Sequence, residues 1–330
     1  MATFDNMKIV TLQDLENNLG TERFPAFMME CEREFKRQVD AISKRVIEDH
    51  SIRMIFLSGP TSSGKTTFST LFTQNLVDSG RRTYLISLDD YYFTEPLEYD
   101  EAGRPDYESI NTLELDLLFE HLKQLQNGEE VNIPTFDFKN RARLYEEHKK
   151  FRLEEGDVVM IEGLHALSEQ LFNDQNRHES LGIFIMPYMR FLHDSKVLDS
   201  KDIRMLRRIS RDVFHRGSPA MSTIDYWPMI SSAEREFVPE YLAAADYYVN
   251  SALPYEFCVI VPKAQRVLSE SIEQYHQGEL PPSTNVKPGL FYADLNRAFK
   301  EAKRLIKACE MIPEVDSSIV PADSILQEFI

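Results

Sequence analysis

Apolar residues recur every three or four positions in residues 11–50, and this spacing predicts helices. Thr11 suits the N-cap of a short helix that stops at Gly20. A longer helix follows, and its apolar face is formed by Met28, Cys31, Phe35, Val39, Ile42 and Val46.

Beyond residue 51 the apolar residues form short continuous runs, which are typical of buried strands. Two such runs are Ile52–Leu57 and Thr83–Leu88. The pattern between them predicts a helix over Lys65–Val77, closed by Gly80. A strand, a helix and a strand in close succession predict a right-handed crossover and a parallel sheet.

The remaining pattern predicts further strands and helices. The strands are Asp157–Ile161, Ile183–Met186 and Tyr247–Asn250, and the helices are Leu113–Gln126, Ile203–His215 and Tyr292–Cys309. Two polar-flanked segments, Val131–Phe138 and Lys150–Leu153, predict a hairpin that projects from the sheet. Residues 262–288 contain Pro and Gln and show only a weak pattern.

The composition of the 330-residue chain, 42% hydrophobic and 28% charged, is that of a globular protein with one enlarged or two ordinary domains. Its net charge of −17 disfavours general nucleic-acid binding. Three widely spaced cysteines exclude a disulfide framework and favour a reducing compartment. Neither a membrane-spanning run nor a signal peptide is visible. We therefore expect a cytoplasmic protein without a nucleic-acid or membrane partner.

The segment from Gly59 to Thr66 fits the phosphate-loop pattern G-x-x-x-x-G-K-[ST], between a predicted strand and a predicted helix. Gly59 and Gly64 allow the backbone to curl until successive N–H groups point at one phosphate. Lys65 can reach the β- and γ-phosphates, and the Thr66 hydroxyl can ligate Mg²⁺. The alternative is a Gly/Ser-rich loop that only begins a helix.

Three carboxylates follow predicted strands, at the sheet edge where open α/β folds bind ligands. Asp89 and Asp90 end the second strand, where a carboxylate could take a proton from an attacking hydroxyl. Glu162 ends the strand Val158–Ile161 and is placed to hold Mg²⁺ or its water shell. The alternatives are ordinary turn or cap residues and a solvated strand-end carboxylate.

Cations recur at steps of three and four on one predicted helix. This arginine face consists of Arg204, Arg207, Arg208, Arg211, His215 and Arg216. It suits a mobile lid that neutralises charge on a triphosphate. Pairing with the neighbouring acids Asp199, Asp202 and Asp212 is the alternative, and a nucleic-acid stripe suits the negative chain poorly.

Together these motifs resemble the uridine kinase and phosphoribulokinase family of P-loop kinases, from about Ile52 to Tyr255. The resemblance runs through Gly59–Thr67, Ser87–Tyr92, Arg104–Asp106, Ile133–Phe138, Val159–Gly163, Ile203–Asp212 and Ala245–Tyr247. It implies a P-loop NTPase fold of the α/β class. Such a fold has a five-stranded parallel sheet flanked by helices, a β-hairpin over the acceptor site and an Arg-rich helical lid.

By this resemblance the protein transfers the γ-phosphate of ATP or GTP to a hydroxyl, with Mg²⁺. Asp89 would be the catalytic base, and Lys65, Arg207 and Arg211 would act with it. The donor would be bound by Gly59, Thr61, Ser62, Ser63, Gly64, Lys65, Thr66, Thr67, Arg204 and Arg208. Asp106 would hold ribose hydroxyls of the acceptor, beside Tyr91, Phe136 and Arg141, and Thr66 and Glu162 would hold the metal.

The hairpin departs from the pyrimidine-nucleoside branch of the family. Where those kinases have Tyr-Asp-Phe followed by His, this chain has Phe136-Asp137-Phe138 and then Arg141. Phenylalanine can stack on a base but cannot donate a hydrogen bond to it. Arg141 would suit an anionic acceptor. Residues Met186 to Lys201 also exceed the uridine kinase turn and look more like a longer bacterial form of the family.

We therefore expect a nucleoside kinase, with a uridine- or cytidine-like acceptor preferred. A kinase for a sugar phosphate or another anionic acceptor is the runner-up, and an idle ATP-binding or RNA-associated module is a third hypothesis. The expected organisation is an N-terminal helical extension (1–50), a kinase domain (51–260) and a C-terminal helical extension packed on it (261–330). The hairpin would span about 131–153 and the lid about 202–220. Asn250–Leu253 would contact the adenine, and a homo-oligomer is possible.

Overall fold

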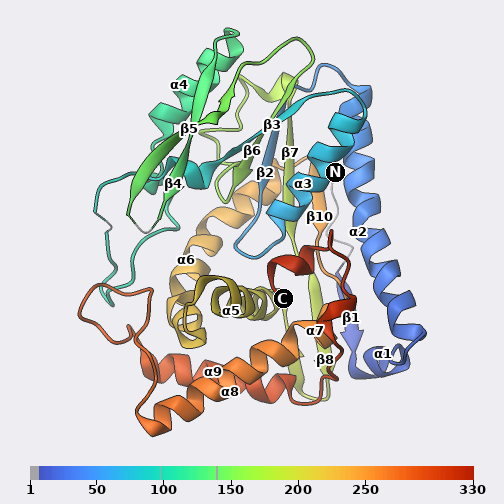
Figure 1. The fold of residues 1–330 in the computed structure, drawn as a ribbon, viewed down its shortest axis with the longest axis vertical. Coiled ribbons are helices and arrows are strands. Elements are labelled where there is room, and N and C mark those ends of the chain that lie inside the picture. The colour runs from blue at the N-terminus through green and yellow to red at the C-terminus, as the bar shows by residue number, and fades with distance from the viewer. Residues whose placement is uncertain (1–6, 97, 139) are drawn as a thin grey trace.

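A five-stranded parallel sheet forms the centre of the protein in the computed structural model, which describes residues 7–96, 98–138 and 140–330 (Figure 1). The strand order is β10-β7-β2-β6-β3. The strands are β10 (Tyr247–Asn250), β7 (Ser180–Met186), β2 (Met54–Ser58), β6 (Val158–Gly163) and β3 (Thr83–Ser87). The predicted α/β class and parallel sheet are therefore confirmed.

Helices cover both faces of this sheet. They are α2 (Arg23–Glu48), α3 (Lys65–Asp78), α4 (Leu115–Gln126) and α6 (Ala220–Ala244). The other helices, α5 (Ser200–Arg216), α7 (Glu256–Val259), α8 (Val261–Gln277) and α9 (Leu295–Cys309), pack against α6 or against one another. Side chains of β2 alternate between the two cores, since Ile55 and Leu57 pack with α2 and α3 while Phe56 packs with α4. The central strands β7, β2 and β6 are buried on both faces, as their continuous apolar runs predict, while the edge strands β3 and β10 are partly exposed.

A second, three-stranded sheet was not predicted. β1 (Lys8–Thr11) pairs in parallel with β8 (Met189–His193), which pairs antiparallel with β9 (Lys196–Leu198). The segment that exceeds the uridine kinase turn therefore supplies two strands to which the N-terminal strand adds. Thr11 caps α1 (Leu12–Asn17) in a capping box with Asp14, as its position in the sequence predicts.

Three other predictions are corrected. The hairpin pairs β4 (Val131–Asp137) with β5 (Ala142–Phe151), so its second strand begins earlier than predicted. Residues 262–288 are largely helical, because α8 spans Val261–Gln277. The long helix α6 was not predicted, and it contains two prolines.

The C-terminal residues return to the sheet. After α9 the chain forms two short 3₁₀ turns, Ser317–Ile319 and Ile325–Glu328, and the second lies beside the N-terminus of α3 (Figure 1). None of the helices in the described ranges is long and apolar enough to cross a membrane.

Candidate functional site

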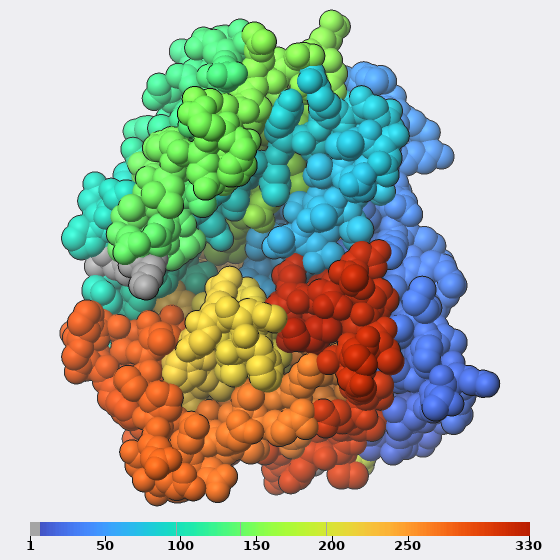
Figure 2. Space-filling model, viewed as in Figure 1, coloured from blue at the N-terminus to red at the C-terminus, as the bar shows by residue number. Residues whose placement is uncertain are grey.

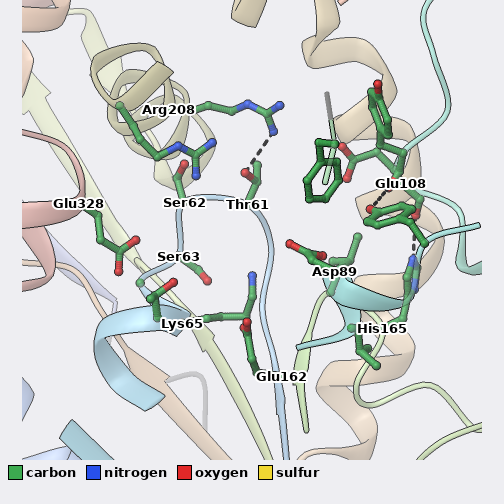
Figure 3. Close-up of a pocket in the computed structure, with 18 of the residues that line it drawn as sticks. Thr61, Ser62, Ser63, Lys65, Asp89, Glu108, Glu162, His165, Arg208 and Glu328 are labelled. Atoms are coloured by element: carbon green, nitrogen blue, oxygen red, sulfur yellow. Dashed lines mark hydrogen bonds between the residues drawn. The ribbon is translucent and has the colours of Figure 1, made fainter. Parts of the chain in front are cut away.

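A pocket of about 650 Å³ opens at the carboxyl ends of the sheet strands (Figure 3). The predicted site residues that line it are Thr61, Ser62, Ser63, Gly64, Lys65, Thr66, Asp89, Glu162, Arg208 and Arg211. Gly59, Thr67, Tyr91, Asp106, Phe136, Arg141, Arg204 and Arg207 do not line it. The structure thus brings together the phosphate loop, two carboxylates and two arginines.

The phosphate loop joins β2 to α3 and is held in a curled conformation. A Cβ on Gly59 would lie 2.3 Å from the carbonyl oxygen of Ile185, so only glycine fits there. Gly64 has a φ of +89° at the N-cap of α3, which glycine adopts without strain. The buried hydroxyls of Ser62 and Ser63 have no hydrogen-bond partner among the described residues. Such hydroxyls suit the oxygens of a bound phosphate.

Lys65 is the first residue of α3 and folds back over the loop. Its ammonium group donates to the carbonyl oxygen of Gly59 at 2.8 Å. Lys65 also lines the pocket opposite Asp89 (Figure 3). The Thr66 side chain is exposed to the pocket, so its hydroxyl is available to a metal ion.

Two arginines of α5 bind backbone carbonyl groups of the phosphate loop without lining the pocket themselves. Arg204 donates to the Thr61 carbonyl and forms a bidentate ion pair with Glu234. Arg207, fully buried, donates to the Ser62 carbonyl.

The partner of Arg207 is Glu256 of α7, in a bidentate ion pair at 2.6 and 2.8 Å. The expectation that Arg204 and Arg207 face the triphosphate is therefore corrected. Carboxylates on other elements, the partly buried Glu234 of α6 and the buried Glu256 of α7, hold the two guanidinium groups away from the pocket. The predicted movement of α5 as a lid stays a prediction.

Asp212 organises the arginines that do face the pocket. Its carboxylate accepts from Arg208 and Arg211 at 3.0–3.2 Å, and Arg216 lies 3.8 Å away. Burial alone would raise the pKa of Asp212, but the three cations hold that pKa below its usual value. The pairing alternative for these arginines is thus realised in part, while Arg208, Arg211 and Arg216 still line the pocket.

The two acids after β3 have different surroundings. Asp90 accepts from the backbone N–H of Phe136 at 2.9 Å and pairs with Lys149, so it anchors the hairpin. The Asp89 carboxylate lines the pocket and makes no hydrogen bond to a described residue. Burial raises the pKa of Asp89, and Lys65 opposes this rise. Asp89, not Asp90, is therefore placed to exchange a proton with a ligand.

Glu162, at the end of β6, lies beside Asp89 and Lys65. It accepts from the Ser87 hydroxyl at 2.9 Å, and burial raises its pKa. With Thr66 it offers two oxygen ligands, which suits Mg²⁺ because this ion usually keeps several waters and takes only one or two protein ligands beside phosphates. The described residues contain no larger metal-binding group of His, Cys, Asp and Glu.

The residues predicted for the acceptor do not line the pocket, and their roles stay predictions. Tyr91 is buried, and its hydroxyl pairs with His121. Asp106 accepts hydrogen bonds from the backbone N–H groups of Glu108 and Ser109, as an aspartate at the start of a turn commonly does. Arg141 donates to the carbonyls of Phe93 and Glu95, while its Nη1 atom has no hydrogen-bond partner among the described residues.

Aromatic residues line one side of the pocket. Phe136 is buried and packs edge-on against Phe138, which lines the pocket with Tyr92 and Tyr107. Asn250–Leu253, the predicted adenine contact, lies outside the pocket, because Ser251, Ala252 and Leu253 are buried under α7.

Glu108 is one of the pocket residues that sequence reasoning missed, along with Tyr107 and Glu328. Burial raises the pKa of Glu108 to about 7, Arg208 opposes this rise, and Glu234 and Asp89 add to it. His165 fixes its backbone, since Nε2–H donates to the Glu108 carbonyl at 2.8 Å while Nδ1 accepts from the Tyr241 hydroxyl at 2.7 Å. Burial lowers the pKa of His165 to about 4, so its ring is neutral near pH 7.

Comparisons with known proteins agree with this geometry. The sequence matches the phosphoribulokinase / uridine kinase family over residues 54–254. A uridine kinase of Macrococcus caseolyticus is 30% identical over 200 residues, 59% of this chain and 86% of the relative. One of Halobacterium salinarum is 30% identical over 199 residues, 59% of this chain and 78% of the relative.

A solved structure described as a possible uridine kinase from Bacillus stearothermophilus aligns with 65% of this chain and 98% of its own. Its TM-score is 0.43 and its sequence identity to this chain is 17%. The family match, over residues 54–254, includes the phosphate loop, Asp89, Glu162 and the arginine face. The chain therefore belongs to the phosphoribulokinase / uridine kinase family of kinases and is a phosphotransferase that uses a hydroxyl group as acceptor.

Proposed function

We propose that this protein transfers the γ-phosphate of ATP to a hydroxyl of a nucleoside-like acceptor. The observation that carries the proposal is the Asp89 carboxylate, which faces Lys65 of the phosphate loop across one pocket. Phosphoryl transfer needs little covalent chemistry from a protein and depends on positioning and on charge stabilisation.

The donor side of the pocket is built from backbone and cations. The curled loop and the N-terminus of α3 direct N–H groups at the phosphates, and Lys65 adds a positive charge. Arg208 and Arg211, oriented by Asp212, would neutralise charge that develops on the transferred group. Thr66 and Glu162 would hold Mg²⁺, which neutralises phosphate charge and orients the phosphate oxygens when bound.

Asp89 would accept the proton of the acceptor hydroxyl. Its raised pKa makes the carboxylate a better proton acceptor than an exposed aspartate. The alternative acid, Asp90, binds the Phe136 N–H and Lys149 of the hairpin, which favours Asp89 as the base.

The acceptor side suits a ring with hydroxyls. Phe138, Tyr92 and Tyr107 offer faces and edges on which a base can stack, and Glu108 can bind hydroxyl groups. The two relatives named above are uridine kinases, which supports a pyrimidine nucleoside as the first acceptor to test.

Incubation with Mg-ATP and a panel of nucleosides tests this proposal. We expect ADP release that depends on the acceptor, and Asp89→Asn should lower kcat by about 10²–10⁴-fold with little change in ATP affinity. Asp78→Asn, an exposed aspartate on α3, is the matched control and should keep full activity. Equal ADP release with and without every acceptor would contradict the proposal, as would near-full turnover by Asp89→Asn.

A further inference from the structure

The C-terminal segment, residues 324–330, lies against the phosphate loop. In Figure 2 it is the red surface between α3 (cyan) and α5 (yellow). Ile325 packs so closely on Gly64 that a Cβ there would lie 2.9 Å from the Ile325 Cδ1 atom. Glu328 lines the pocket beside the loop (Figure 3).

Glu328 binds two donors of Thr67. Its Oε1 atom accepts from the Thr67 backbone N–H at 3.1 Å and from the Thr67 hydroxyl at 2.7 Å. Thr67 is the third residue of α3, so this N–H is among those that α3 leaves without an intrahelical partner. A carboxylate thus fills donors at a helix N-terminus that is otherwise suited to phosphate.

We propose that Glu328 is an internal competitor of the nucleotide phosphates, and that its displacement from Thr67 sets the affinity for the phosphate donor. This inference depends on one part of the proposed function, namely that the phosphate donor is a nucleoside triphosphate. A phosphate oxygen and Glu328 cannot accept from the same Thr67 groups, and two anions at that spot repel each other.

The charges of the pocket support competition. Three carboxylates, those of Asp89, Glu162 and Glu328, line the same pocket. Binding a polyanion would therefore bring negative charge to a place that holds Asp89, Glu162 and Glu328. Of these three carboxylates, Glu328 is the one that contacts the Thr67 N–H and hydroxyl, so its displacement frees those two donors for a phosphate.

The rest of the segment is anchored independently of Thr67. Ile325, Leu326 and Phe329 are fully buried. The Phe329 carbonyl accepts from the Ser210 hydroxyl at 2.6 Å, and the Ser324 hydroxyl contacts that of Tyr255 at 3.1 Å. Glu328 itself is only half-buried, so a rotation of its side chain releases Thr67 while the segment stays in place.

Titration calorimetry with Mg-ATP and no acceptor tests this inference. Glu328→Ala leaves both Thr67 donors free. We expect its Kd for Mg-ATP to fall about tenfold, because a hydrogen bond to a charged group contributes roughly the free energy of a tenfold change in affinity. Glu328→Gln keeps an acceptor without the charge and should give a smaller decrease. The matched control is Glu314→Gln, in the same C-terminal region. The Glu314 carboxylate pairs with Arg266 at the surface, so this variant should keep the parental Kd for Mg-ATP.

An unchanged or higher Kd in both Glu328 variants would overturn the inference, since Glu328 would then be neutral or would bind the nucleotide. Equal thermal unfolding midpoints of the variants and the parent exclude a folding defect as the cause. Normal ATP binding without phosphate transfer to any acceptor would contradict the proposed function alone.

Discussion

Glu108 is a titratable side chain in the pocket wall whose ionisation should be measurable in the stability of the protein. Its pKa rises from the usual 4.5 to about 7, mainly through burial. The folded protein therefore binds more protons than the unfolded chain between these values. This difference makes the contribution of Glu108 to stability fall as the pH rises from about 4.5 to 7.

We expect Glu108→Gln to remove this loss. The unfolding free energy of the variant minus that of the parent should increase between pH 5 and pH 8. For a pKa shift of this size, the increase is on the order of 3 kcal/mol. Urea denaturation at four pH values measures the gain, with the exposed Glu101→Gln as control. A pH-independent difference between parent and Glu108→Gln would show that the carboxyl titrates normally.

The acids of the pocket region show which side chains could be predicted from the sequence and which could not. The pattern predicted that an acid after β3 faces the site, and the structure puts Asp89 there. It could not tell Asp106 from Glu108, because the turn that Asp106 caps decides which side chain enters the pocket. The partners of Arg204 and Arg207 lie 30 and 49 positions away, so no local spacing reveals them.

At the scale of elements, α5 supports the phosphate loop through a buried ion pair. Glu256 of α7 has no exposed surface, and it holds Arg207, which in turn holds the Ser62 carbonyl. We expect Glu256→Gln to cost about 3–5 kcal/mol of unfolding free energy, because it leaves a buried guanidinium without its counter-charge. The variant should also bind Mg-ATP more weakly, since Ser62 loses its support.

Urea denaturation and calorimetric titration measure these two effects. The control is Glu273→Gln, an exposed acid on α8 that should change neither quantity by more than about 0.5 kcal/mol. A Glu256→Gln protein with parental stability would mean that the ion pair contributes nothing net.

Elements with a strong apolar period were predicted well, whereas α8, α6 and β5 were among those missed or misplaced, for separate reasons. The apolar stripe of α8 contains the small residues Ala264 and Ser271, which weaken its period, and Pro262 stands at the start of the helix, where proline is tolerated. Pro228 and Pro239 disguise α6, although a helix can accommodate proline at a cost. The strand β5 is largely exposed, so it lacks the alternation that marks a half-buried strand.

At the scale of the molecule, one hydrophobic core joins the segments that precede and follow the family match. The core contains Phe35 of α2, Ile55 of β2, Leu268 of α8 and Leu305 of α9. We propose that the N- and C-terminal extensions are parts of one cooperative unit with the kinase sheet. Such a unit unfolds in one transition, whereas a separate extension would unfold by itself.

Phe35→Ala tests this unity, because Phe35 is buried in the N-terminal extension while the single tryptophan, Trp227, is buried in α6. We expect the variant to lose about 3–5 kcal/mol of unfolding free energy through lost burial and a residual cavity. The urea midpoint should fall equally by Trp227 fluorescence and by far-ultraviolet circular dichroism. Met29→Ala, which alters an exposed side chain of the same helix, should leave both midpoints unchanged. If only the dichroism midpoint moves in Phe35→Ala, the extension unfolds separately.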